Sequence, residues 1–327
     1  MRVLVLHSDI APGAPPDEED TLITARAVGQ ALEQRGHHTV QRAFVAEPVS
    51  FDATIAASRP DIVFNLVESV FAQGDLASIS AAMLEKRGIL FTGACAAALS
   101  CLADKPFTKR VLRAAGLPTP DWSEGPDWEG LADGIPYIVK SANEDASLGL
   151  DDCAVVSGRH AVRERSEKCA SKYGGRWFAE AYLSGREFNV SLLEEEGMPR
   201  ILPVAEIRFE NWRADRPRIV GYAAKWDPES PDCSGTPRVF GLEPQSPLAR
   251  AFAEHSAVAW RLFGLRGYAR VDFRIDEQGA PMILEINPNP CLEPHAGFAA
   301  AAAEAGISYE ELVEKILNAE IARRGEY

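Results

Sequence analysis

Short apolar runs alternate with longer amphipathic stretches in the N-terminal part of the chain. The apolar runs predict strands at residues 2–6, 39–45 and 61–67, because buried parallel strands are short and almost continuously apolar. The stretches between them have helical spacing and predict helices at 21–34 and 52–58. This order is typical of a small parallel sheet with helices on its faces. We therefore expect an α/β fold in this part of the chain.

A loop rich in proline and acidic residues is predicted at 9–20, with Asp20 as the N-cap of the following helix and Gly36 just beyond its end. The loop contains a single glycine, Gly13, so the Gly-x-Gly-x-x-Gly pattern of dinucleotide-binding proteins is absent. The fold class alone would permit a nicotinamide-dependent oxidoreductase. The missing glycines argue against that function.

The remainder of the chain predicts short strands and helices separated by polar loops. Expected helices are 77–86, 105–115, 248–263 and 309–323, and expected strands are 136–140, 177–183 and 186–193. Residues 119–134, rich in Pro, Gly and Trp, predict a loop or a boundary, and residues 141–149 predict a polar loop. Residues 208–240 predict a long active-site loop with a strand near 221–226. The length of the chain indicates two or three domains.

Two strands near the C-terminal end carry acidic residues on one face. Strands at 270–275 and 282–287 flank the sequence Asp-Glu-Gln-Gly, which is a hairpin signal. If residues 278–279 form a two-residue loop, Asp272 lies directly opposite Glu285 on the same face. Adjacent carboxylates repel each other unless a cation lies between them. The alternative is a surface hairpin whose acidic face is merely solvated.

Asn287 adds a third oxygen ligand, and Mg2+ is the cation that prefers such ligands and usually serves substrate phosphates. Arg270 lies on the same face, where a cation beside the metal suits an anionic phosphate group. The next residues, 287–290, read Asn-Pro-Asn-Pro and predict a rigid loop rather than a simple strand end. These observations favour a magnesium site over a solvated face.

Three lysines lie at the ends of predicted elements: Lys105 begins a helix, Lys140 ends an apolar strand, and Lys225 ends a strand-like segment. Each alone is an ordinary solvated side chain. Together with the metal triad, they predict point charges that bind a flexible triphosphate. Glu180 and Glu187 bracket a short turn, where a carboxylate suits an adenine amino group or ribose hydroxyls. The alternative, that Glu187 is only the polar face of a strand, stays open.

Composition limits the partners. The chain has 327 residues, 46% of them apolar and 25% charged, with a formal net charge of -14. This acidic balance argues against nucleic acid and anionic membranes, although a nucleotide needs only a local cluster of lysines and metal. Six scattered cysteines lack Cys-x-x-Cys spacing, so we expect reduced thiols in a cytoplasmic protein, with Cys291 beside the Asn-Pro-Asn-Pro turn as the exception to watch. No apolar run suits a membrane span or a signal peptide.

Several motifs occur together along the chain. They are Phe-Thr-Gly at 91–93, Ala-Ala-Leu-Ser through Asp-Lys at 97–105, Gly-Leu-Pro at 116–118, Ile-Val-Lys at 138–140, Glu-Ala-Tyr-Leu-Ser-Gly-Arg-Glu-Phe at 180–188, Arg-Val-Asp at 270–272, Glu-Ile-Asn at 285–287 and Ala-Gly-Ile-Ser-Tyr at 305–309. On these motifs the chain resembles the ATP-grasp enzymes and is similar to the D-alanine–D-alanine ligases over nearly its whole length. The resemblance implies a Rossmann-like pre-ATP-grasp domain at 1–103, followed by an ATP-grasp fold with a central subdomain at 104–180 and a C-terminal subdomain at 181–327.

The resemblance implies a role for each nucleotide candidate. Lys105 and Lys140 would contact ATP phosphates, and Lys225 would reach the γ-phosphate. The loop at 141–149 would close over the phosphates as a lid that includes Ser147. Adenine and ribose would be held by Glu180, Tyr182, Leu183 and Glu187.

The resemblance also implies two Mg2+ ions, for which Mn2+ can substitute, bound by Asp272, Glu285 and Asn287. Arg270 would stabilise an acyl phosphate and its tetrahedral adduct, so Arg270 and Lys225 are the expected catalytic residues. The implied reaction is phosphorylation of a substrate carboxylate by ATP, followed by attack of an amine. A homodimer formed through the first domain is implied as well.

Departures from the family pattern concentrate where amino-acid substrates bind. The lid has Asp145 and Ala146 where the family has glycine and serine, and Trp226 replaces a tyrosine of the lid network. A carboxylate at Asp145 costs Coulomb energy near a triphosphate unless it faces solvent, a lysine or a metal. Ala296 replaces a serine that binds the substrate carboxylate, which removes a charge-assisted hydrogen bond of about 1.5–3 kcal/mol. Candidate pocket residues are Arg270, Glu19 (with Glu18 and Asp20 as alternatives), Glu68, Asn289, Glu293 and His295.

We therefore expect an ATP-dependent, ADP-forming carboxylate–amine ligase whose substrate is an amino acid or peptide-like acid other than D-alanine. D-alanine–D-alanine synthesis for peptidoglycan precursors is the first alternative. An ATP-grasp phosphotransferase that phosphorylates a hydroxyl is the second. A non-catalytic nucleotide-binding protein is disfavoured, because it needs neither the metal triad nor Arg270. The expected partners are small-molecule acid and amine substrates.

Overall fold

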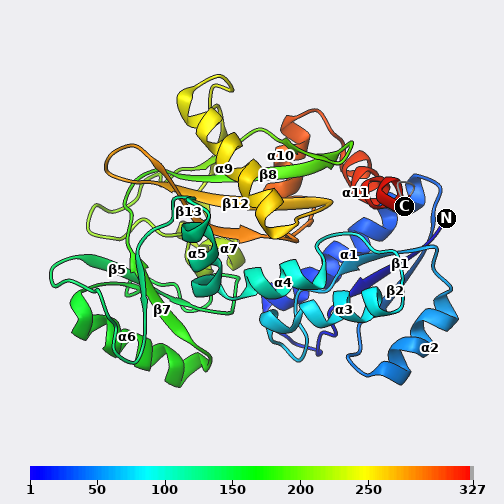
Figure 1. Cartoon of the computed structure of the whole chain (residues 1–327), viewed down its shortest axis with the longest axis horizontal. Helices are drawn as coiled ribbons and strands as arrows, with labels where there is room; N and C mark the ends of the chain where they lie inside the picture. Colours follow the sequence, from blue (N-terminus) through cyan, green and yellow to red (C-terminus); the bar gives the residue numbers. More distant parts are fainter. Residues whose placement is uncertain (325–327) are drawn as a thin grey trace.

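Three sheets with helices packed around them form the computed structural model, which describes residues 1–324 (Figure 1). The N-terminal sheet is parallel with the order β2-β1-β3, which confirms the predicted parallel arrangement. Its strands are β1 (Arg2–His7), β2 (His38–Ala43) and β3 (Ile62–Leu66). The helices of this part are α1 (Pro16–Gln34), α2 (Pro48–Ser58), the 3-10 helix η1 (Gly74–Leu76), α3 (Ser78–Lys86) and α4 (Ala96–Ala103).

Helix α1 begins at Pro16 and not after Asp20, so the loop predicted at 9–20 is wrong over its second half. Proline suits the first turn of a helix, because its ring fixes a helical φ and the missing N–H has no partner there anyway. Three acidic residues follow in the first turn, where carboxylates interact favourably with the free N–H groups. Proline and acidic residues therefore mark a helix start here, and Asp20 lies inside the helix.

The central sheet is antiparallel with the order β4-β7-β5-β6. Asp104 caps the helix that begins at Lys105, as predicted, because its Oδ1 accepts a hydrogen bond from Phe107 N (2.8 Å). The predicted loop at 119–134 includes the short strand β4. The elements of this part are α5 (Lys105–Ala114), β4 (Trp122–Glu124), β5 (Pro136–Ser141), β6 (Val155–Ser157), α6 (Gly158–Tyr173) and β7 (Trp177–Ala181).

The third sheet is antiparallel with the order β11-β10-β8-β12-β13, and β9 pairs with β8. Its strands are β8 (Glu187–Glu195), β9 (Met198–Ile201), β10 (Ala205–Ile207), β11 (Arg238–Phe240), β12 (Tyr268–Ile275) and β13 (Pro281–Asn287). The helices are α7 (Tyr222–Trp226), α8 (Pro231–Ser234), α9 (Pro247–Phe263), α10 (Gly297–Glu304) and α11 (Tyr309–Arg324). The strand predicted at 221–226 is wrong, because the Ala-Ala-Lys segment after the extended Gly221 forms helix α7.

The hairpin of β12 and β13 pairs Asp272 with Glu285, as predicted, but by a different route. Ile275 pairs with Pro281 instead of Met282, and Asp276 N donates to the backbone oxygen of Ala280 (2.9 Å), so residues 277–279 form a three-residue loop in place of the predicted two-residue loop. A β-bulge next to Asp272 then shifts the register by one residue and leaves Leu284 without a direct partner. The longer turn and the bulge compensate, which is why the acidic pair is still formed.

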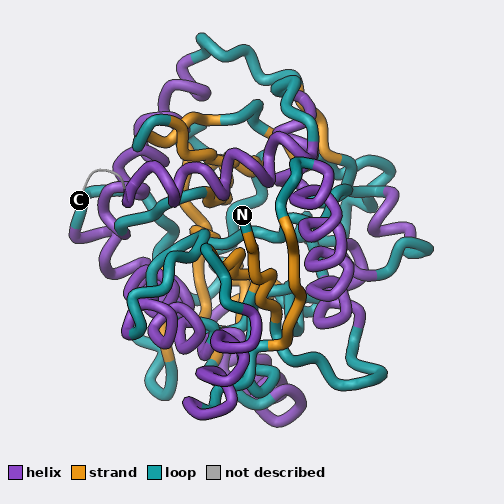
Figure 2. The backbone as a smooth tube through the Cα atoms, turned by 90° about the vertical axis from the view of Figure 1, so that its right-hand side faces the viewer, coloured by secondary structure: helices purple, strands orange, loops and turns teal. Residues whose placement is uncertain are grey.

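The N-terminal sheet and the third sheet share one apolar core, and the central sheet has its own. Leu6 and Val63 of the N-terminal sheet and Val190 of the third sheet belong to one continuous apolar cluster, whereas the central sheet has a separate core. Helices lie around the sheets in the second view of the backbone (Figure 2). Each sheet falls almost wholly within one predicted segment, and we keep the three-domain division as a proposal. Within residues 1–324, no helix is both long and apolar enough to cross a membrane.

Candidate active site

The predicted metal residues meet on one face of the hairpin. Arg270 holds Asp272 through two hydrogen bonds, from Nε to Oδ1 (2.7 Å) and from Nη2 to Oδ2 (2.8 Å). Asn287 Nδ2 donates to Asp272 Oδ2 (3.2 Å) and to Glu285 Oε1 (3.4 Å). Asn189 on β8, which was not predicted, donates from Nδ2 to Asp272 Oδ1 (2.8 Å). Two carboxylates, two amides and a guanidinium therefore share one small volume.

Lysines from three separate elements surround this acidic pair. Burial alone would raise the pKa of Glu285, but Lys105, Lys225 and Lys140 lower it to about 2. Glu285 is therefore ionised at neutral pH. Burial raises the pKa of Asp272, although its ion pair with Arg270 acts in the opposite direction. The lysines that were predicted from unrelated motifs are thus brought to the same site as the acidic pair.

The donor atoms of this site suit a hard cation. Within residues 1–324, no group of three or more His, Cys, Asp or Glu is placed to hold a metal ion, so a metal would depend on the mixed set Asp272, Glu285 and Asn287. Carboxylate and amide oxygens are the ligands that Mg2+ prefers, and Mg2+ commonly completes its coordination with water and substrate phosphates. The residues therefore fit Mg2+ in chemistry.

Lys105 is held by the loop that was predicted to form the phosphate lid. Its Nζ donates to the backbone oxygen of Glu144 (2.9 Å) and to Asp145 Oδ1 (2.6 Å). The Lys105 side chain is 10% exposed, whereas that of Asp145 is 67% exposed. The neighbouring lid residue Glu144 contacts the N-terminal part of the chain, because its Oε2 accepts a hydrogen bond from Gly74 N (3.2 Å). The Coulomb cost predicted for Asp145 is therefore offset by a lysine and by solvent.

The lid at residues 141–149 is hydrogen-bonded to the long loop at 208–240, which contains α7. Trp226 Nε1 donates to the backbone oxygen of Ala146 (3.1 Å), and Ser147 Oγ donates to the backbone oxygen of Val220 (2.9 Å). Both lid residues have a left-handed backbone, with φ of 56° at Ala146 and 61° at Ser147. Non-glycine residues in this region cost on the order of 1–3 kcal/mol each and persist only where surrounding contacts hold them. The indole of Trp226 thus contacts the lid without the tyrosine hydroxyl that the resemblance implies at this position.

Tyr222, which was not predicted, supplies a hydroxyl one helical turn before Trp226. It donates to Asp17 Oδ1 on α1 (2.7 Å) and links the long loop to the N-terminal part. Burial, the hydrogen bond and the charge of Asp17 raise the pKa of Tyr222 to about 12. On a helix, the spacing of four residues would have indicated that Tyr222 and Trp226 lie on the same side. Residues 221–226 were predicted to be a strand, so this signal was missed.

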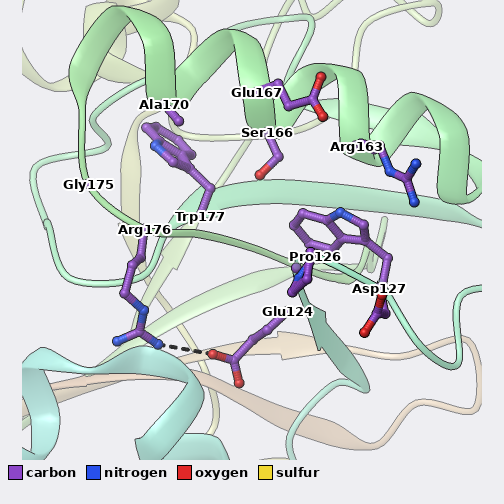
Figure 3. A pocket seen from close by; sticks show the side chains of 12 residues that line it. Glu124, Pro126, Asp127, Arg163, Ser166, Glu167, Ala170, Gly175, Arg176 and Trp177 are labelled. Carbon is purple, nitrogen blue, oxygen red and sulfur yellow. Dashed lines mark hydrogen bonds and ion pairs between the residues drawn. The ribbon is translucent and has the colours of Figure 1, made fainter.

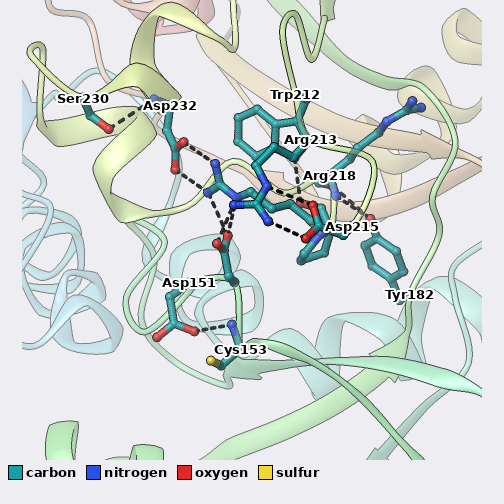
Figure 4. A network of polar contacts seen from close by, with 12 residues as sticks. Asp151, Cys153, Tyr182, Trp212, Arg213, Asp215, Arg218, Ser230 and Asp232 are labelled. Carbon is teal, nitrogen blue, oxygen red and sulfur yellow. Dashed lines mark hydrogen bonds and ion pairs between the residues drawn. The ribbon is translucent and has the colours of Figure 1, made fainter.

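A second set of ion pairs joins the long loop to the segment that follows the lid (Figure 4). Arg216 Nη2 lies 2.7 Å from Asp152 Oδ1 and 2.8 Å from Asp232 Oδ2, so one guanidinium bridges two segments. Arg218 N donates to the hydroxyl of Tyr182 (2.7 Å), a predicted adenine residue just after β7. Leu183, the next predicted adenine residue, is partly buried in the same connection.

The carboxylate of Glu180 is enclosed between lysines and does not face open space. Its Oε1 contacts Lys140 Nζ, and its Oε2 lies 2.5 Å from Nζ of Lys109, which was not predicted. Direct contact of this carboxylate with adenine or ribose, as predicted, is therefore disfavoured by its burial. Glu187 is also paired, because Arg274 Nη2 lies 3.2 Å from its Oε2.

The predicted substrate residues fall into two groups, of which the first is acidic. Glu19 is exposed on α1, whereas Asp20 Oδ2 lies 3.0 Å from Cys291 Sγ, so the placement favours Asp20 over Glu19. Glu68 Oε2 accepts a hydrogen bond from Thr21 Oγ1 (3.4 Å). Solvent still reaches Glu68, but the surrounding protein and the charge of Asp20 raise its pKa to about 7.

The remaining substrate candidates lie in the segment after β13. Asn289 Oδ1 accepts a hydrogen bond from Ala94 N (2.9 Å), so this oxygen holds the chain near Gly93 and is not free for a ligand. A Cβ at Gly93 would lie 2.7 Å from the same oxygen, which explains the glycine. Glu293 Oε2 accepts a hydrogen bond from the backbone N of His295 (2.7 Å), and the side chain of His295 is exposed. Of these residues, Glu293 lies near Asp20, because Cys291 Sγ contacts both the backbone N of Glu293 (3.3 Å) and Asp20 Oδ2 (3.0 Å).

A groove on the central domain lies apart from these residues (Figure 3). Arg163, Glu167 and Trp177 line it, and the ion pair of Arg176 Nη2 with Glu124 Oε2 (3.0 Å) closes one side. It contains none of the predicted catalytic, nucleotide or metal residues. We therefore place the candidate active site at the β12–β13 hairpin and under the lid.

Comparisons with known proteins identify the family of the chain. The family model described as D-ala D-ala ligase C-terminus matches residues 113–318. A D-alanine–D-alanine ligase from Chromohalobacter salexigens is 31% identical over 325 residues, covering 97% of this chain and 93% of the relative. An uncharacterized protein from Sinorhizobium fredii is 29% identical over 308 residues, covering 90% of this chain and 86% of the relative. The crystal structure of the Bacillus anthracis D-alanine–D-alanine ligase complexed with ATP matches with a TM-score of 0.74 at 21% identity, covering 100% of this chain and 99% of that chain.

The fold is that of the ATP-grasp enzymes, with a parallel N-terminal sheet and two antiparallel sheets. The family match and the full-length relatives show that the chain belongs to the D-alanine–D-alanine ligase family. It is accordingly an ATP-dependent ligase that forms carbon–nitrogen bonds and releases ADP.

Proposed function

We propose that the protein joins an amino acid or peptide-like acid other than D-alanine to an amine. The observation that carries this proposal is the meeting of Arg270, Asp272 and Glu285 on one hairpin face, where three lysines lower the pKa of Glu285 to about 2. Such a site can hold a phosphate, a hard cation and a carboxylate at the same time. A protein that only bound nucleotide would not need Arg270 at this position.

The nucleotide residues follow from their places around this site. We assign the ATP phosphates to the lysines and Ser147, the adenosine to the turn after β7, and Mg2+ to the hairpin. Mg2+ would supply charge neutralisation at the phosphate oxygens, and two ions are expected. The assigned residues are Lys105, Lys140, Lys225 and Ser147 for phosphates, Tyr182, Leu183 and Glu187 for adenosine, and Asp272, Glu285 and Asn287 for the metal.

The chemistry has two steps. An oxygen of the substrate carboxylate attacks the γ-phosphorus of ATP, the bond to the bridging oxygen breaks, and ADP leaves with its electron pair. The amine nitrogen then attacks the carbonyl carbon of the acyl phosphate, inorganic phosphate leaves, and the nitrogen loses a proton. Lys225 and Lys105 balance charge on the transferred group, and Arg270 stabilises the oxyanion of the adduct. The lid excludes water, which would otherwise hydrolyse the acyl phosphate.

The substrate side of the site supports an acid or amine that carries an ammonium group. Within residues 1–324, Asp20, Glu68 and Glu293 have no ion pair with lysine, arginine or histidine, so their carboxyl groups are available to a cationic group, which would also favour the ionised form of Glu68. Ala296 is the N-cap residue of α10, makes no side-chain hydrogen bond and offers no hydroxyl to a substrate carboxylate. D-alanine–D-alanine synthesis is the second candidate function, and it is favoured by the relatives with that name at 28–31% identity.

Phosphate release tests the proposal. The protein is incubated with ATP, Mg2+ and pools of amino acids and small amines, and products are identified by mass spectrometry. We expect phosphate only when an acid and an amine are both present, together with a product whose mass equals their sum minus water. Release with D-alanine alone would support the second candidate. A stable phosphorylated product without amide formation would instead assign the protein to the phosphotransferases.

The free cysteines bear on where the protein works. All six cysteines lie within residues 1–324 and are free thiols, which suits the reducing cytoplasm where ATP is available. We propose a cytoplasmic homodimer that associates through the first domain. Size-exclusion chromatography with light scattering at several protein concentrations tests the assembly.

A further inference from the structure

A buried lysine outside the predicted set shares one carboxylate with a proposed phosphate lysine. Glu180 contacts both Lys109 and Lys140, and its own side chain is 1% exposed. The Lys109 side chain is also 1% exposed, whereas that of Lys140 is 16% exposed. Two ammonium groups therefore face one carboxylate, and of the two only Lys140 has solvent access and can meet a ligand.

Lys109 is fixed in place from the opposite side by the hairpin. Its Nζ donates to Thr119 Oγ1 (2.9 Å), and the Thr119 hydroxyl donates to the backbone oxygen of Ile283 on β13 (2.8 Å). Lys109 also lies on the buried face of α5, one turn after Lys105. This chain of contacts joins β13, the strand that carries Glu285, to Glu180 on β7, and the Lys109 side chain is enclosed by it.

The second lysine changes the charge balance between Glu180 and Lys140. A buried carboxylate that loses its only cation is strongly destabilised, so a Glu180 paired with Lys140 alone would retain that ammonium. Burial raises the pKa of Glu180, but Lys109 and Lys140 together lower it, so the carboxylate is ionised and needs one cation. Lys109 supplies that cation from a position closed to solvent, where burial lowers its pKa and the charge of Glu180 acts against that shift. The positive charge of Lys140 is then in excess and can be shared with an anionic ligand.

We propose that Lys109 is a positioning residue that neutralises Glu180 and thereby leaves the Lys140 ammonium available to a nucleotide phosphate. This inference rests on the proposed function, which assigns a phosphate to Lys140. With Lys109 present, the group of three side chains carries one net positive charge. Without it, the net charge is zero and Lys140 belongs to Glu180.

The test compares ATP binding by calorimetry, with Mg2+ present, in the full-length protein and its variants. Lys109→Met keeps the length of the side chain and leaves the pair of Glu180 and Lys140 intact, so the protein should fold. We expect the dissociation constant for ATP to rise about tenfold, because a charge-assisted contact is lost to Glu180. Adding Glu180→Gln to Lys109→Met should restore affinity to within about threefold of wild type, since Lys140 is released again.

The restoration separates positioning from packing, because a merely structural defect at Lys109 would not be repaired by a second change in the same core. Wild-type affinity in Lys109→Met, or no recovery in the double variant, overturns the inference. If Lys109→Met does not fold, Glu180→Gln alone is decisive. It should bind ATP at least as tightly as wild type, and weaker binding overturns the inference.

A matched control is Lys168→Met, which removes an exposed lysine from α6 in the same domain and should leave ATP affinity unchanged. The wild-type titration distinguishes a failure of the proposed function from a failure of the role of Lys109. Absence of ATP binding in wild type contradicts the proposed function itself. Normal binding in wild type and an equal value in Lys109→Met contradicts only the role of Lys109.

Discussion

Replacing Asp145 by asparagine tests whether the lid carboxylate competes with nucleotide for Lys105. Asp145 Oδ1 accepts a hydrogen bond from Lys105 Nζ (2.6 Å), the ammonium to which we assign an ATP phosphate. A phosphate that binds Lys105 must displace this carboxylate, and the displaced charge then stays close to the triphosphate. Asp145→Asn removes both costs while it keeps the size of the side chain. We therefore expect the variant to bind ATP more tightly than wild type.

The magnitude follows from the exposure of the two partners. A hydrogen bond to a charged group contributes about 1.5–3 kcal/mol when it is well shielded, whereas exposed ion pairs contribute roughly 0.2–1 kcal/mol. The Lys105 side chain is 10% exposed, but that of Asp145 is 67% exposed, so solvent screens the contact. We take about 0.5–1.5 kcal/mol, which corresponds to a two- to twelvefold lower dissociation constant.

The assay is calorimetric titration with ATP and Mg2+ at about 0.05 M and about 0.5 M salt, because screening weakens exposed charge pairs. The gain from Asp145→Asn should shrink at the higher salt concentration. Glu129→Gln, which removes an exposed carboxylate of the same domain away from the lid, should leave affinity unchanged. Unchanged or weaker ATP binding by Asp145→Asn would refute the competition, and weaker binding would show that the carboxylate supports the nucleotide site.

Three further predictions follow from the fold and the lid. Tyr222→Phe removes the hydroxyl that donates to Asp17 and should weaken ATP binding by about 1 kcal/mol, and Asp17→Asn in the same protein should add nothing further in a double-mutant cycle. The surrounding protein and the charge of Asp20 raise the pKa of Glu68 from 4.5 to about 7, so the folded state binds more protons between these values and the free energy of unfolding falls as pH rises through them. Urea titrations at about pH 5 and about pH 7.5 should show a smaller fall in Glu68→Gln, and an identical fall would contradict the assignment. Phe252→Ala should lower the free energy of unfolding by about 3–5 kcal/mol, because this ring is fully buried against two aromatic rings behind the hairpin.

The parts that sequence predicted well depend on local periodicity. The alternation of two short strands is enough to place Asp272 and Glu285 on one face, and the structure confirms their pairing. The same reasoning could not give the length of the turn or the bulge, and the pairing was correct because the two departures compensate. The start of α1 at Pro16 was missed because proline and acidic residues favour both loops and helix N-termini.

The residues that sequence did not reveal act through contacts between distant segments. Lys109 occupies a buried position of an amphipathic helix, and a lysine at an apolar position is a usable signal, but its partner Glu180 lies in another element. Tyr222 was hidden by the incorrect strand prediction at 221–226. The burial of Glu180 and the engagement of Asn289 with Ala94 likewise depend on how separate segments pack, which periodicity does not encode.

Calorimetric titration of the intact protein with ATP and Mg2+, in wild type and Glu285→Gln, tests the central claim most directly. We expect one nucleotide bound per chain in wild type and a dissociation constant on the order of tenfold higher or more in the variant, with circular dichroism unchanged. A wild-type protein that binds no ATP at millimolar concentration, or a variant that binds as tightly as wild type, would contradict the assignment of this hairpin as the phosphate and metal site.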